Sequence, residues 1–149
     1  MKKTASKSTK AIIKNMVLFA VGAFGYYTLE VIYRGFSHPS MAVCGGICLI
    51  GIYTINRKMP NARLLPKALL CSLFITAVEF LAGCIINLWL GWNVWSYAAL
   101  KFNLLGQVSL LFTFIWFLLS LIICALIGFM SRIKRRLYYK KKTEQIAPF

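Results

Sequence analysis

Residues 68–90 read ALLCSLFITAVEFLAGCIINLWL and carry a single charged side chain, that of Glu79. A helix needs about 20 mostly apolar residues to cross the hydrocarbon core of a bilayer, so this stretch is long enough to span it. Three further apolar stretches qualify, at residues 15–33, 39–55 and 104–130, and the last is long enough to require tilt. The sequence therefore predicts an all-α integral membrane protein with four transmembrane helices.

The composition excludes the other broad classes of protein. Of the 149 residues, 60% are hydrophobic and 14% are charged, whereas an average soluble domain has roughly 45–50% and about 25%. A soluble fold of this size could not bury so much apolar surface. Disordered chains lack such surface altogether.

The positive charges predict the orientation. The chain has 18 Lys and Arg against 3 acidic residues, and all the cations except Arg34 and Lys101 lie in the N-terminal arm, in residues 56–67 or in the C-terminal tail. The positive-inside rule then places both termini in the cytoplasm. We expect a basic cytoplasmic arm (1–14), a transmembrane domain (15–130) and a polybasic cytoplasmic tail (131–149). A cleaved signal sequence would also begin with basic residues, but Tyr26, Tyr27 and Glu30 stand where small residues should mark the cleavage site.

The connection between the third and fourth spans is rich in aromatic residues. Trp89, Trp92 and Trp95 are spaced three apart, and residues 91–103 contain only one charge, Lys101. Such rings settle at the membrane–water interface, so we expect a short amphipathic outer segment, as helix or loop.

Neither the cysteines nor the histidine indicates catalysis. The five cysteines all fall within spans, where buried free thiols are expected, and His38 stands beside a helix start, where a capping role is expected. No catalytic triad, glycine-rich phosphate loop or metal motif is present in the sequence. We therefore predict no enzymatic activity, no metal and no cofactor.

Two of the three acidic residues lie within spans, where a charge is costly. The third, Glu144, lies in the tail. Glu30 precedes Arg34 by four residues, the spacing of an ion pair within one helix. Either Glu30 only neutralises the charge of Arg34 at the membrane interface, or the pair forms part of an outward-facing polar pocket.

Glu79 belongs to a polar stripe that repeats with helical spacing: Ser72, Thr76, Glu79, Gly83 and Asn87. Lipid cannot satisfy this face, so it must point toward the other helices. A weaker stripe in the fourth span consists of Ser109, Thr113, Ser120, Cys124 and Gly128, with Asn103, Gly106 and Gln107 at its outer end. The stripes are either packing seams or the lining of a pocket for a small solute or cation. The residues predicted to bind such a ligand or to couple ions are Glu30, Arg34, Glu79, Asn87, Trp92, Trp95, Asn103 and Gln107.

The basic tail predicts contact with anionic lipid at the cytoplasmic face, through Arg132, Lys134, Arg135 and Arg136. No aromatic platform or recognition motif accompanies these cations, so nucleic acid is not an expected partner.

Several short motifs together resemble a known family: EVIYRG (30–35), SMAVCGG (40–46), VEFLAG (78–83) with Asn87, LGW (90–92), WSY (95–97) and NLLGQ (103–107). Over residues 25–120 the chain is similar to the small bacterial membrane proteins called "putative ABC-transporter type IV". That family usually has an acidic residue in the WSY motif, where this chain has Ser96. The resemblance implies a multi-pass component of a bacterial plasma membrane that works with a separate ATPase, and it supplies no catalytic residues.

The leading hypothesis is therefore a transport-related membrane component, acting as a homo-oligomer or with a partner protein because one chain is small for a complete path. A non-transporting scaffold or regulatory subunit is the alternative. An intramembrane enzyme acting on lipid is the third hypothesis.

Overall fold

The computed structural model describes residues 2–146, and it describes side chains for residues 8–140, 142 and 143. The helices are α1 (Lys2–Arg34), α2 (Pro39–Lys58), α3 (Leu64–Gly83) and α4 (Leu110–Ile146), and the π-helical segment η1 (Cys84–Trp89) continues α3. Two short antiparallel strands, β1 (Asn103–Leu104) and β2 (Val108–Ser109), precede α4. Four helical stretches are long and apolar enough to cross a membrane, as the sequence predicts.

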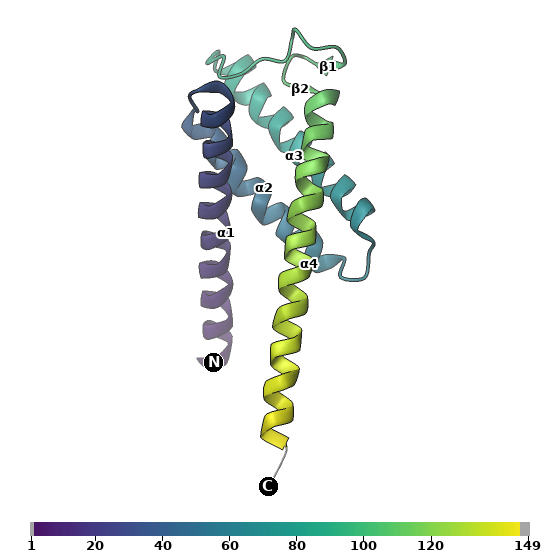
Figure 1. Ribbon diagram of the computed structural model, residues 1–149. Helices are drawn as coiled ribbons and strands as arrows, with labels where there is room; N and C mark the ends of the chain where they lie inside the picture. Colours follow the sequence, from purple (N-terminus) through teal and green to yellow (C-terminus); the bar gives the residue numbers. More distant parts are fainter. Residues whose placement is uncertain (1, 147–149) are drawn as a thin grey trace.

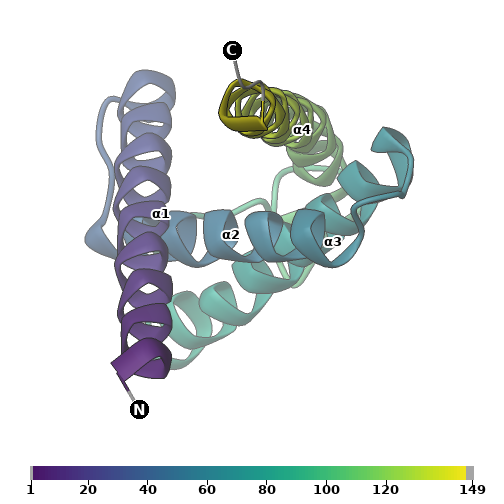
Figure 2. The same cartoon turned by 90° about the horizontal axis from the view of Figure 1, so that it is seen from below.

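The helices alternate in direction, so that α1 begins and α4 ends opposite the hairpin of β1 and β2 (Figure 1). Consecutive helices pack against one another, and α2 also touches α4. Figure 2 shows a gap between the backbones of α1 and α4. These two helices meet through side chains, with ring contacts between Tyr26 and Trp116 and between Tyr33 and Phe112. The four helices thus form an open arrangement rather than a closed four-helix bundle.

Local sequence explains where α1 ends and α2 begins. Gly35 has a φ of +80°, a conformation that favours glycine, and its amide donates to the Val31 carbonyl at the end of α1. Pro39 occupies the first turn of α2, where its missing N–H costs nothing. His38 precedes it as the N-cap, and its Nδ1 accepts from the Ser40 amide at 3.3 Å, which is the predicted capping role.

Glycines bring α1 and α2 close together. A Cβ added to Gly45 would contact the Tyr26 Cβ and would lie 2.6 Å from the Gly22 carbonyl oxygen. Membrane helices pack closely through such small residues because lipid offers no hydrophobic force to press helices together. The close approach of Gly22 and Gly45 fixes the point at which α1 crosses α2.

The buried core lies where α2, α3 and α4 meet. Its buried residues are Cys48, Ile52, Cys71, Ile75, Trp116 and Cys124. All five cysteines are free thiols, four of them buried and Cys84 half-buried. Asn56 Nδ2 donates to Cys124 Sγ at 3.1 Å, and the Cys124 and Cys71 sulfurs lie 3.8 Å apart, so this inner core includes polar contacts.

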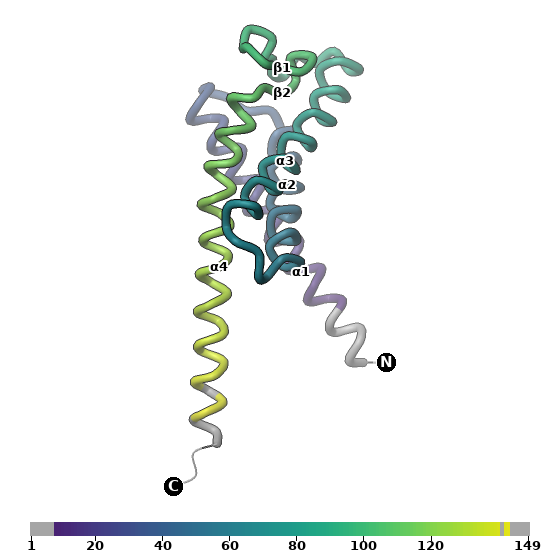
Figure 3. Tube along the Cα trace, turned by 90° about the vertical axis from the view of Figure 1, so that its right-hand side faces the viewer, coloured from purple at the N-terminus to yellow at the C-terminus, as the bar shows by residue number. Residues whose placement is uncertain are grey.

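The helix ends differ from the predicted spans. The fourth helix begins at Leu110 rather than at residue 104, because Phe102, Leu105 and Gly106 adopt positive φ values and turn the chain into the hairpin. Figure 3 shows this hairpin at the top of α4 and α4 extending below the other helices. Both α1 and α4 run through the predicted domain boundaries at residues 14 and 130, so these boundaries mark changes of composition within continuous helices.

Candidate functional site

The buried carboxyl of Glu79 joins three helices. Its side chain is 1% exposed, and it projects from α3 toward α1 and α4. The Tyr26 hydroxyl of α1 donates to Oε1 at 2.8 Å, and Trp116 Nε1 of α4 donates to Oε2 at 2.7 Å. The two rings also lie against each other, with centroids 5.6 Å apart. Glu79 is therefore held between aromatic side chains that come from separate parts of the sequence.

A second polar group lies at the hairpin end of α1. Arg34 Nη2 lies 2.9 Å from Glu30 Oε1, which is the predicted ion pair. Ser37 Oγ donates to Glu30 Oε2 at 2.8 Å, so both oxygens of this carboxylate have partners. Arg34 Nη1 donates to the Val94 carbonyl at 2.9 Å and ties α1 to the outer loop. The Nε of Arg34 is buried and has no hydrogen-bond acceptor in the described part of the chain, and Nη2 has only the ion pair.

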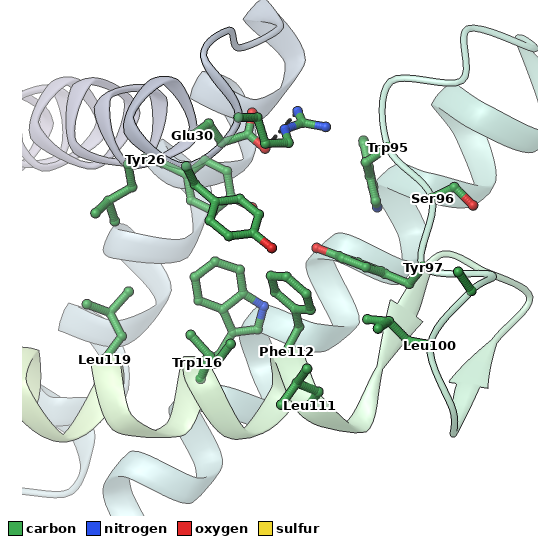
Figure 4. A pocket seen from close by; sticks show the side chains of 15 residues that line it. Tyr26, Glu30, Trp95, Ser96, Tyr97, Leu100, Leu111, Phe112, Trp116 and Leu119 are labelled. Carbon is green, nitrogen blue, oxygen red and sulfur yellow. Dashed lines mark ion pairs between the residues drawn. The ribbon is translucent and has the colours of Figure 1, made fainter.

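A cavity of about 600 Å³ lies between these two groups, α4 and the outer loop. Its volume is within the range of about 300–1,000 Å³ that small-molecule sites occupy. Figure 4 shows Tyr26 and Glu30 on one side, Phe112 and Trp116 on another, and Tyr97 reaching in from the loop with its hydroxyl directed into the cavity. Most of the lining is apolar or aromatic, with the polar groups concentrated near Glu30 and Tyr97.

Tyr97 supplies a hydrogen-bond donor that faces this cavity. Its ring lies against Phe112, with centroids 4.4 Å apart, and its hydroxyl has no hydrogen-bond partner among the described residues. Burial, and secondarily the negative charge of Glu79 and Glu30, raises the pKa of Tyr97 above its ordinary value. The hydroxyl therefore keeps its proton at physiological pH and can donate to a ligand.

Asn87 and Gln107, both predicted as ligand-binding residues, bond to the protein itself. Asn87 Nδ2 donates to the Trp95 carbonyl at 2.9 Å and to Gln107 Oε1 at 2.8 Å, and Asn87 Oδ1 accepts from the Val94 amide at 2.7 Å. Trp95 Nε1 in turn donates to the Gln107 carbonyl at 3.0 Å. This buried network holds the outer loop on η1, and neither amide side chain lines the cavity.

Of the remaining predicted residues, some line the cavity and others lie outside it. Trp95 lines the cavity together with Glu30 and Arg34. Trp92 is mostly exposed and contacts the ring of His38. Asn103 is exposed and holds a turn, donating to the Leu100 carbonyl at 2.7 Å. The structure thus does not unite all eight predicted residues in one pocket.

Similarity to a known protein family agrees with a chain that crosses the membrane several times. A family model described as "Putative ABC-transporter type IV" matches residues 12–147. The chain belongs to this family. No curated protein and no solved structure gives a significant match.

Membership confirms the resemblance read from the motifs and makes this chain an ABC-transporter-related multi-pass membrane protein. The match includes most of the first membrane-spanning stretch, all of the other three, the outer loop and most of the basic tail. The side chains of Arg132, Lys134, Arg135 and Arg136 are exposed on the lower part of α4. The side chain of Glu144 lies outside the described residues. Among the described residues there is no group of three His, Cys, Asp or Glu that could hold a metal ion.

Three cavity-lining residues were missed as site residues: Tyr97 and the two donors to Glu79, Tyr26 and Trp116. The sequence does contain a signal for Tyr26 and for Trp116. Tyr26 precedes Glu30 by one helical turn, and Trp116 lies between Thr113 and Ser120 at helical spacing, on the weaker polar stripe. Aromatic side chains with a polar atom usually find a partner when buried, so both were candidates for bonding the buried acid.

Proposed function

We propose that the chain is a transport-related membrane component that binds a solute in the cavity beneath the outer loop and uses Glu79 to couple ion movement to that binding. The observation that carries this proposal is the pair of hydrogen bonds that Glu79 accepts from Tyr26 and Trp116, because both aromatic residues also line the cavity. An ionisable group at membrane depth is a functional candidate by default.

The geometry supports a mechanism of coupling. The Tyr26 and Trp116 rings stand between the cavity and the Glu79 carboxyl, which does not itself line the cavity. A solute that displaces either ring breaks a hydrogen bond to Glu79 and changes its access to protons or cations. Binding in the cavity and ion exchange at Glu79 would then depend on each other, as linkage requires.

The orientation follows from charge. We place both termini and the loop between α2 and α3 in the cytoplasm, because these segments carry most of the positive charges. The cavity then opens toward the outer face of a bacterial plasma membrane. The exposed cations Arg132, Lys134, Arg135 and Arg136 then contact anionic lipid at the cytoplasmic face. Nucleic acid is not a proposed partner.

Energy and additional transmembrane surface come from other chains. The sequence contains no glycine-rich phosphate loop, so we propose a separate ATPase partner or a homo-oligomer, with no enzymatic activity and no cofactor in this chain. Exposed apolar side chains on all four helices leave surface on which such assembly can be built.

The alternative, a non-transporting scaffold, is favoured by one observation. The side chains of Asn87 and Gln107 form hydrogen bonds with groups of the same chain, as residues with a purely structural role would. In that case Glu79 serves only to join α1, α3 and α4.

A substitution that preserves shape separates these functions. The full chain would be reconstituted in liposomes containing the pH-sensitive dye pyranine, and proton flux would be followed under an imposed pH gradient. We expect Glu79→Gln to abolish the flux without changing folded yield or oligomeric state, whereas Glu144→Gln, which removes a negative charge from the tail, leaves the flux intact.

The other outcomes decide against the proposal. Flux that is unchanged in Glu79→Gln, or wild-type liposomes that conduct no better than empty ones, would refute the coupling role. Collapse of assembly in Glu79→Gln together with absent wild-type flux would favour the scaffold.

A further inference from the structure

The cavity continues along the gap between α1 and α4. A second cavity of about 470 Å³ lies toward the middle of the helices, and the two cavities share Tyr26, Leu29, Trp116 and Leu119 in their lining. The two cavities are neighbours along the gap between the α1 and α4 backbones, with the contacting Tyr26 and Trp116 rings lining both, and together we call them the α1–α4 groove.

The two ends of the groove differ in chemistry. Polar side chains, those of Glu30, Arg34, Ser96 and Tyr97, gather at the hairpin end. The other end is lined almost entirely by apolar groups, including Val21 of α1 and residues of α2 and α4. From Val21 to Arg34, α1 rises roughly 20 Å at about 1.5 Å per residue. Half of a hydrocarbon core about 30 Å thick is roughly 15 Å, so the groove has the length and polarity of one lipid leaflet.

At the polar end, hydrogen-bond donors lack acceptors, whereas the carboxylate of Glu30 already has partners. Both oxygens of Glu30 are already bonded, to Arg34 and Ser37. The Nε of Arg34 lacks an acceptor, and the Tyr97 hydroxyl points into the cavity without a partner among the described residues. Neighbouring atoms cover the Arg34 Nε, so a small rotation of the guanidinium is needed to present it. These donors suit an anionic oxygen group such as a phosphate.

We propose that the α1–α4 groove binds one phospholipid, with its phosphate at Arg34 and Tyr97 and an acyl chain along Gly25 in the apolar end. This inference rests on the proposed function and names the ligand class of its cavity. The lipid enters sideways from the bilayer, because the groove lies between two helices whose backbones stand apart. An apolar helix of a second copy could fill the lower part of the groove, but it would leave the Arg34 Nε without an acceptor.

Two glycines provide a matched test of the apolar end. Gly25 lines the groove, and a Cβ built there meets no atom within 4 Å, so Gly25→Phe fills the groove without a clash at the backbone. Gly128 on α4 is equally open but lies outside the lining of both cavities, so Gly128→Phe is its control.

The probe is phosphatidylglycerol with a photoreactive acyl chain, added to the purified full chain in dodecyl maltoside micelles. We expect labelled peptides from α1 and α4 at the groove, background labelling in Gly25→Phe and undiminished labelling in Gly128→Phe. Labelling that persists in Gly25→Phe, or that maps elsewhere, would overturn the inference, as would a crosslink between two copies at the groove.

A second set of variants tests the headgroup. A charge-assisted hydrogen bond typically changes affinity by about tenfold or more, so Arg34→Gln should weaken labelling by about that factor and Tyr97→Phe by somewhat less. The control Lys101→Gln removes the other cation of the outer side, which does not line the groove. Photoreactive diacylglycerol, which has the same chains and no phosphate, should label wild type as weakly as phosphatidylglycerol labels Arg34→Gln.

Three results would contradict the headgroup site: equal labelling by the two lipids, no effect of either Tyr97→Phe or Arg34→Gln, or displacement of the lipid by excess inorganic phosphate. The last would indicate a soluble anion instead. Lipid labelling with no proton flux would refute the proposed function alone. Flux coupled to Glu79 with no lipid labelling would refute this inference alone.

Discussion

The hydrogen bond from Tyr26 to Glu79 offers the sharpest test of the buried site. The substitution Tyr26→Phe removes one oxygen and keeps the ring that lies against Trp116. It leaves Oε1 of Glu79, a residue that is 1% exposed, without its donor at 2.8 Å. Side-chain hydrogen bonds between membrane helices contribute about 0.6 kcal/mol on average and up to about 1.7 kcal/mol. Because water cannot replace the lost donor here, we expect the free energy of unfolding to fall by about 1–2 kcal/mol.

The neighbouring tyrosine provides the control. Tyr27 is exposed, so Tyr27→Phe should change the free energy of unfolding by less than about 0.5 kcal/mol. Both variants would be unfolded reversibly in mixed micelles with rising sodium dodecyl sulfate, followed by helicity and tryptophan fluorescence. A double-mutant cycle completes the measurement: in Glu79→Leu, which has no acceptor, the effect of Tyr26→Phe should shrink by about 1 kcal/mol. An effect of Tyr26→Phe no larger than that of Tyr27→Phe, or one that persists in Glu79→Leu, would refute the assignment.

Two further predictions concern the helix crossing and the outer loop. Gly45→Ala should lower the free energy of unfolding by about 1–3 kcal/mol, measured in the same micelles, since its new methyl group contacts Tyr26 and the Gly22 backbone; Gly128→Ala, which meets no atom within 4 Å, should not. Tyr97 should show no tyrosinate absorbance until well above pH 10, because burial and nearby glutamates raise its pKa. An unfolded tyrosine releases its proton near pH 10 and the folded one keeps it, so stability should fall as the pH rises above about 10, and Tyr97→Phe should flatten that fall.

The membrane spans could be predicted because they depend on length, hydropathy and helical period. These are properties of a single segment, and they decide by themselves whether that segment can span the hydrocarbon core. The same period placed Ser72, Glu79 and Asn87 on one buried face of α3 and η1, as the structure has them. The pairing of Glu30 with Arg34 is equally local, since the two residues lie four apart on one helix.

The partners of the buried side chains could not be predicted in this way. Glu79 lies 53 residues from Tyr26 and 37 from Trp116, so their contact depends on how three helices cross. Asn87 is likewise predicted from the sequence to bind a ligand, but its Nδ2 donates to the Trp95 carbonyl of the outer loop. Polarity at membrane depth signals that a partner exists, but it does not say whether that partner belongs to the protein or to a ligand.

The start of the fourth helix shows a different limit. Leu104 and Leu105 continue the apolar run by hydropathy, yet Leu105 has a φ of +51° and Gly106 a φ of +67°. The conformation is set by contacts around the turn, such as the bond from the Gly106 amide to Asn103 Oδ1 at 2.9 Å. An apolar composition does not distinguish a turn held by such contacts from the first turn of a helix.

The open groove follows from the way α1 is attached. Lipid tails are as apolar as leucine side chains, so no hydrophobic force closes the gap between α1 and α4. Glycine contacts hold α1 on α2, while Tyr26 and Arg34 fasten it by hydrogen bonds to Glu79 and to the Val94 carbonyl. Those two polar attachments face the groove. A ligand bound between them would therefore act on both at once, and this connects occupancy of the groove to the carboxyl of Glu79 without requiring a large movement of the helices.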